Sequence, residues 1–116
     1  MMLKRFLTLL IIFSIYIGYS QTSNTPKFFG QCMIAVQTIE EAQELTNMLK
    51  ENPYVDVVRV DWPTKRIFLT TKDISTFSES NFNSWLGEFS SLATCFQIGL
   101  HGVDQVNPYP FTNCND

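Results

Sequence analysis

Residues 54–71, YVDVVRVDWPTKRIFLTT, decide the fold of this 116-residue chain. Alternating apolar residues predict two strands, Val55–Asp61 and Arg66–Thr71, on either side of a short turn. Pro63 fixes its own φ and has no N–H to donate to a sheet, so it ends the first strand. The stretch therefore predicts a β-hairpin.

A strand and a helix are predicted on each side of this hairpin. Residues 32–38 (CMIAVQT) and 94–100 (TCFQIGL) have strand composition. Apolar residues at helical spacing predict one helix that follows Thr38 and ends before Pro53, and a second helix that follows Thr76. Each helix begins with a capping-box pattern, in which a threonine precedes a glutamate by three residues.

The order β-α-β-β-α-β predicts an α+β fold. It indicates a ferredoxin-like two-layer sandwich with four antiparallel strands in the order 4-1-3-2 and two helices on one face. The domain is assigned to residues 31–102, preceded by a flexible leader (21–30) and followed by an irregular tail (103–116). The edge strand of this sheet would be Val55–Asp61.

The first 20 residues predict a secretory signal peptide. Lys4 and Arg5 precede an apolar run, and Gly18 and Ser20 provide small residues at the cleavage site. The alternative is an uncleaved anchor, but the apolar run has 14 residues where a span needs about 20. We therefore expect export to the periplasm or the extracellular space, with no membrane attachment after cleavage.

Charge argues against a nucleic-acid partner. Of the 8 basic residues, two lie in the signal segment, which leaves 6 against 11 acidic residues. The remaining cations are scattered along the chain and form no basic stripe.

The central hairpin also resembles that of heavy-metal-associated domains. The matching letters are Pro53, Val55, Val58, Val60, Asp61, Thr64, Lys65, Ile67 and Leu69. The resemblance extends weakly over residues 34–100 and implies the same fold. That family binds copper or zinc through Cys-x-x-Cys between strand 1 and helix 1, and residues 35–41 contain no cysteine here.

Three cysteines in an exported chain predict one disulfide and one free thiol. Cys32 and Cys95 open neighbouring antiparallel strands, so they are expected about 20 Å apart at opposite ends of the sheet. A disulfide needs Cα atoms within about 7 Å. The tail leaves from the end of the last strand, which is expected beside Cys32, so we predict Cys32–Cys114, with Cys95–Cys114 as the alternative.

No catalytic or cofactor motif is present, and the chain is predicted not to be an enzyme. A metal site from Cys32, His101 and Cys114 fits no ligand spacing. Cys95 and His101 are six residues apart on one strand, about 20 Å, which is too far for a catalytic pair.

The sheet face without helices is the predicted interaction surface. Its candidate residues are Arg59, Phe68, Thr70 and Gln97; the alternatives are the edge strand and a face covered by Tyr109 and Phe111 of the tail. The leading hypothesis is a small exported protein-interaction module. Two alternatives are a metal-handling protein, from the family resemblance, and a cell-wall-binding or protease-inhibitor module, by analogy of fold.

Overall fold

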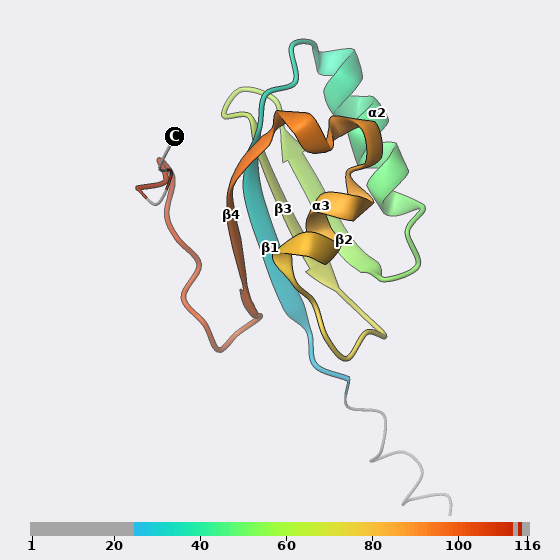
Figure 1. The fold of residues 1–116 in the computed structure, drawn as a ribbon, viewed down its shortest axis with the longest axis vertical. Coiled ribbons are helices and arrows are strands. Elements are labelled where there is room, and N and C mark those ends of the chain that lie inside the picture. Colours follow the sequence, from blue (N-terminus) through green and yellow to red (C-terminus); the bar gives the residue numbers. More distant parts are fainter. Residues whose placement is uncertain (1–24, 113, 115–116) are drawn as a thin grey trace, which may run out of the picture.

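The computed structural model describes residues 25–112 and 114, so the predicted signal peptide lies outside the described residues. One four-stranded sheet forms the centre of the fold. Its helices lie on one side, and the C-terminal segment runs along the other (Figure 1).

The hairpin that dominates the sequence is present as β2 (Val55–Asp61) and β3 (Arg66–Thr71). Lys65 adopts a left-handed conformation, with φ 55°, which closes the turn. Its ammonium lies 3.9 Å from the centroid of the Trp62 ring and donates to the carbonyl of Val36 at 2.7 Å. The turn is therefore attached to the segment that follows the first strand.

The first strand begins earlier than the sequence indicated. β1 spans Phe28–Ile34, not residues 32–38, because Phe28 and Phe29 pair with the far end of β4 (Ala93–Leu100). The backbone N–H of Phe28 also donates to the Thr71 hydroxyl at 3.0 Å. The predicted leader therefore contributes residues 28–30 to the sheet.

All strand pairs are antiparallel, in the order β2-β3-β1-β4. Counted from the β4 edge, the same adjacencies read 4-1-3-2, with β2 at the opposite edge. The predicted fold class nevertheless needs correction in its helical layer, which has three segments instead of two. We describe the fold as a small α+β fold.

The second helical region is where the prediction is wrong. The helix begins two residues late, because Ser78 and Asn81, not Thr76 and Glu79, form the reciprocal capping box. It is also short: α3 spans Glu79–Trp85 and gives way to a 3-10 helix, η1 (Gly87–Leu92). Gly87 has φ +55°, a conformation that ends an α-helix and favours glycine.

The first helix, α2 (Ile39–Lys50), follows the sequence pattern closely. Thr38 caps it by accepting from the backbone N–H of Glu41 at 3.1 Å. Side chains of all three helical segments pack with one face of the sheet in a single core cluster. Its fully buried members are Cys32, Ile34, Val36, Leu45, Leu49, Ile67, Leu69, Phe82 and Leu86.

Candidate functional site

The C-terminal tail (residues 103–112 and 114) crosses the sheet face opposite the helices. A tight turn directs it there, because the N–H groups of Val103 and Asp104 donate to the carbonyl of Leu100 at 3.1 and 2.9 Å. The carboxylate of Asp104 accepts from the Leu100 N–H at 2.7 Å. The chain therefore reverses at the end of β4 and returns over the sheet.

Two glutamines hold the returning chain. Gln31 of β1 and Gln97 of β4 lie opposite each other in the sheet, and the Gln31 amide donates to the Gln97 side-chain oxygen at 2.7 Å. The Gln31 amide also donates to the Asn107 carbonyl at 3.0 Å. Gln97 donates to the Gln105 carbonyl at 2.9 Å and accepts from the Asn107 N–H at 2.8 Å. This glutamine pair therefore binds the backbone of the tail at two alternate residues.

A small apolar layer lies beside the glutamine pair. Phe29 is fully buried although it is not part of the main core cluster, and its ring stacks on Phe68 with centroids 6.1 Å apart. Gly99 makes room for it, since a Cβ there would lie 2.7 Å from the Phe29 ring and 3.0 Å from the Cβ of Asp104. The start of the tail thus packs against a second, minor core.

The tail ends in a disulfide between Cys95 and Cys114, whose Cα atoms are 4.8 Å apart. The predicted Cys32–Cys114 bridge is wrong, and the alternative pairing is confirmed. Cys32 is fully buried within the core on the helix-facing side. Its environment raises the pKa of its thiol to about 12 by desolvation.

The disulfide was predicted wrongly because the first strand was predicted to start at Cys32. Because β1 begins at Phe28, Cys32 lies late in the strand, between Gln31, which faces Gln97, and Met33, which faces Thr94. It is therefore level with Cys95 and not at the other end of the sheet. A register shift at this point and a positive φ of 61° at Cys95 mark a bulge.

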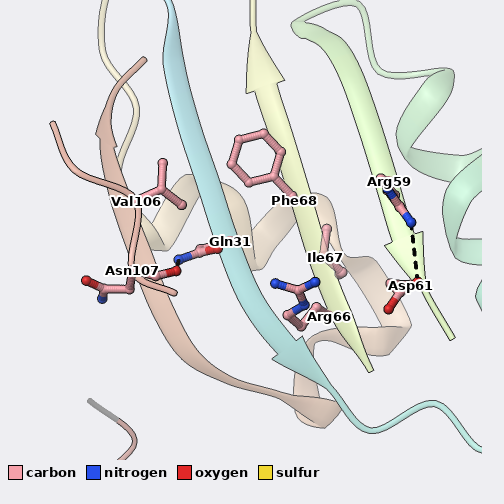
Figure 2. Close-up of a pocket in the computed structure, with 8 residues that line it drawn as sticks. All are labelled: Gln31, Arg59, Asp61, Arg66, Ile67, Phe68, Val106 and Asn107. Carbon is pink, nitrogen blue, oxygen red and sulfur yellow. Dashed lines mark hydrogen bonds and ion pairs between the residues drawn. The ribbon is translucent and has the colours of Figure 1, made fainter. Parts of the chain in front are cut away.

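A groove of about 250 Å³ lies between the tail and β2 (Figure 2). Phe68 of β3 contributes an apolar floor, Ile67 beside it also borders the groove, and the tail contributes one wall through Val106 and Asn107. The polar lining residues are Gln31, Arg59, Asp61 and Arg66.

The side chains of the two arginines in the groove differ in how firmly other residues hold them. Arg66 is held in place, because its Nε donates to the Thr64 hydroxyl at 3.1 Å and its guanidinium lies 4.9 Å from the Tyr109 ring centroid. The Arg59 side chain is 79% exposed, and its contact with Asp61 is long, 3.7 Å. Arg59 can therefore meet a ligand at small cost to existing contacts.

Asp61 remains ionised in this groove. The Thr64 hydroxyl donates to its carboxylate, and this bond, assisted by the Thr64 backbone and by the charges of Arg59 and Arg66, lowers the pKa of Asp61 below its ordinary value. Two arginines and one carboxylate give the groove a net positive charge. Anions are the favoured ligands on this basis.

The four predicted interaction residues lie in different environments. Arg59 and Phe68 line the groove. Gln97 is bound to the tail, and Thr70 is only 5% exposed, with a buried hydroxyl that has no hydrogen-bond partner. Tyr109 does contribute to the cover, as the alternative reading proposed, by lying against Arg66.

Sequence reasoning missed Gln31, Val106 and Asn107. The predicted first strand began after Gln31, so the sequence did not predict that Gln31 lies opposite Gln97. The tail residues had no periodic pattern that would place them on the sheet. Arg66 shares a face with Phe68 in the predicted strand, and that alternation was the available signal.

The fold does not bring together the residues considered for a metal site (Cys32, His101 and Cys114) or for a catalytic pair (Cys95 and His101). Cys114 is bonded to Cys95, while Cys32 is buried on the opposite face of the sheet and His101 is exposed at its end. The described part of the chain contains no group of three or more His, Cys, Asp or Glu residues placed to hold a metal ion.

Within residues 25–112 and 114, no helix combines the length and the hydrophobicity needed to cross a membrane. A disulfide is typical of proteins in an oxidising compartment. No protein-family model, curated protein or solved structure matches this chain.

Proposed function

We propose that this protein is an exported, non-enzymatic interaction module that binds an extended acidic segment of a partner protein. The groove between the tail and β2 carries the proposal, because it joins an aromatic floor to two arginines in one accessible hollow. Aromatic and arginine side chains are the residue types that dominate binding energy at protein interfaces.

The shape and chemistry of the groove favour a peptide over a compact solute. Its lining residues come from the tail, β1, β3 and β2, so the groove crosses the strands, and an extended segment lying across them would contact Phe68 and both arginines (Figure 2). Arg59 is exposed and offers a planar guanidinium for bidentate pairing with a carboxylate. Phe68 beneath it provides an apolar contact for a neighbouring side chain.

Charge distribution supports an acidic partner. The helices on the other side of the sheet carry one lysine, Lys50, against five glutamates: Glu40, Glu41, Glu44, Glu79 and Glu88. An acidic segment is therefore repelled by that side and attracted to the groove. The scattered cations and the acidic balance of the chain argue against nucleic acid.

A non-enzymatic role is supported by the state of the reactive groups. The thiol of Cys32 is buried and has a raised pKa, which disfavours the nucleophilic thiolate. The carboxylate of Asp61 has a lowered pKa, which suits ion pairing better than general-base catalysis. Export is supported by the disulfide and by the predicted signal peptide.

The direct test is peptide binding. Fluorescence anisotropy would compare labelled eight-residue peptides that alternate Glu with Val or Phe against counterparts with Gln in place of Glu. We expect the Glu peptides to bind at least tenfold more tightly at low salt, with the preference falling as salt rises.

Arg59→Gln tests the site itself, with Lys50→Gln at the end of α2 as the matched loss of one positive charge on the helical side. Arg59→Gln should weaken binding about tenfold, equivalent to about 1.4 kcal/mol, whereas Lys50→Gln should change it less than twofold. Equal effects of the two variants would contradict the groove as the binding site.

A further inference from the structure

We propose that the Cys95–Cys114 disulfide is a redox latch for the groove, and that reducing it releases the tail wall and weakens ligand binding. For its binding arm this inference rests on the proposed function. The tail supplies Val106 and Asn107 to the groove, so the site in its present form requires the tail in place.

The hydrogen bonds that hold the tail lie near its start, and farther along the ring of Tyr109 contacts the Arg66 guanidinium. The turn at Asp104 and the bonds of the glutamine pair restrain residues 104–107. None of the apolar side chains in the described part of the tail is fully buried: Val103 is 76% exposed, Tyr109 46% and Val106 39%, and Phe111 is half-buried. Little hydrophobic burial therefore fastens this segment to the sheet.

The disulfide supplies the covalent attachment at the end of the tail. The tail leaves the sheet at Leu100 and is bonded back to Cys95 at the opposite end of β4. The wall residues Val106 and Asn107 lie between these two points in the sequence. Opening the bridge converts a closed loop into a chain with a free end.

The latch is accessible to a reductant. Both Cys95 and Cys114 are half-buried, and they border a separate hollow of about 310 Å³ together with Met33 and Lys65. Cys32 is fully buried, so it does not compete as an exchange partner in the folded protein.

The chemistry is thiol–disulfide exchange with a dithiol. A thiolate of the dithiol attacks one sulfur of the bridge and forms a mixed disulfide, and its second thiol then displaces the protein sulfur. Two electrons and two protons pass to the protein, which ends with thiols at Cys95 and Cys114. The dithiol ends as an intramolecular disulfide.

The test uses the oxidised protein, the same protein reduced with dithiothreitol, and the double variant Cys95→Ser/Cys114→Ser. Cys32→Ala is the matched control, because it removes a sulfur and keeps the bridge. Amide hydrogen exchange by NMR follows the Asn107 N–H, which donates to Gln97 in the latched form. Amides of β1 and β3 report whether the sheet remains folded.

We expect exchange of the Asn107 amide to accelerate at least tenfold on reduction and in the double variant, with the strand amides protected. Glu-peptide affinity should fall at least tenfold in the same samples and stay within twofold in Cys32→Ala. Asn107 protection that stays within twofold after reduction overturns the latch. So does peptide affinity that is unchanged although the bridge is open.

Failure of the proposed function is distinguishable from failure of the latch. If the oxidised protein binds no Glu peptide, the interaction role is wrong and the redox control of ligand binding falls with it. The Asn107 exchange data then still decide whether the disulfide holds the tail against the sheet.

Discussion

Replacement by valine should have opposite effects on stability at two adjacent threonines of β3. Thr70 and Thr71 are both buried, at 5% and 0% exposure. The Thr70 hydroxyl has no hydrogen-bond partner, whereas the Thr71 hydroxyl accepts from the Phe28 N–H at 3.0 Å. Valine has nearly the same shape as threonine, so replacement changes polarity with little change in packing.

The magnitudes follow from this difference. An unsatisfied buried polar group costs about 1–3 kcal/mol, so Thr70→Val should raise the free energy of unfolding by about 1 kcal/mol. Thr71→Val removes a made hydrogen bond and leaves the Phe28 N–H without that acceptor, so it should lower the free energy of unfolding by about 1–2 kcal/mol.

Urea unfolding followed by tryptophan fluorescence measures both variants. With a slope of about 1–2 kcal/mol per molar urea, the midpoint of Thr70→Val should rise by about 0.5–1 M and that of Thr71→Val should fall. In thermal unfolding, 1 kcal/mol corresponds to about 4–8 °C for a domain of this size. A destabilised Thr70→Val, or midpoint shifts of the same sign in both variants, would show that the hydrogen bonding of the two hydroxyls does not set the effect.

Three further predictions concern the cysteines and Asp61. The Cys95–Cys114 bridge has a sequence separation of 19, so in the chain-entropy model its removal should lower the free energy of unfolding by about 3 kcal/mol. Urea unfolding measures this change, with Cys32→Ala as the control variant. A decrease below about 1 kcal/mol would contradict the chain-entropy model for this bridge. The Cys32 thiol, with a pKa raised to about 12 by burial, should react with iodoacetamide only after unfolding, and mass spectrometry showing modification of folded protein at pH 8 would disprove this. The pKa of Asp61, measured by NMR, should lie below the ordinary value for an aspartate, and Thr64→Val should raise this pKa by removing the largest cause of the shift. Because the folded-state pKa is lowered, ionised Asp61 stabilises the protein above its unfolded pKa of about 3.9, and this contribution is lost as the pH falls through the folded pKa. An unchanged pKa in Thr64→Val would argue against the hydroxyl as the cause.

The candidate site was partly visible in the sequence. Alternation within Arg66–Thr71 placed Arg66, Phe68 and Thr70 on one face, and two of these line the groove. Alternation assigns a residue to a face, but it does not say what covers that face. Thr70 is therefore buried although it lies on the side that was expected to be open.

The second helical region shows a different limit. The apolar stripe at helical spacing comprises Phe82, Trp85, Leu86 and Phe89; Phe82, Leu86 and Phe89 are buried core residues, and Trp85 is partly buried against that core. One continuous α-helix and the observed α3 followed by η1 would both bring these side chains to the sheet. The apolar spacing therefore does not distinguish the two structures. The α-helix gives way to η1 at Gly87, whose φ is positive.

By itself, the sequence determined the hairpin, the first helix and the order of strands and helices along the chain. Each of these depends on local periodicity, a cap or a proline, which act over a few residues. The tertiary structure alone decided the start of β1, the Cys95–Cys114 pairing and the tail that forms one wall of the groove. The physical reason is that these features depend on contacts between residues far apart in the chain. Gln31 and Asn107, 76 positions apart, are joined by a hydrogen bond that no local pattern predicts.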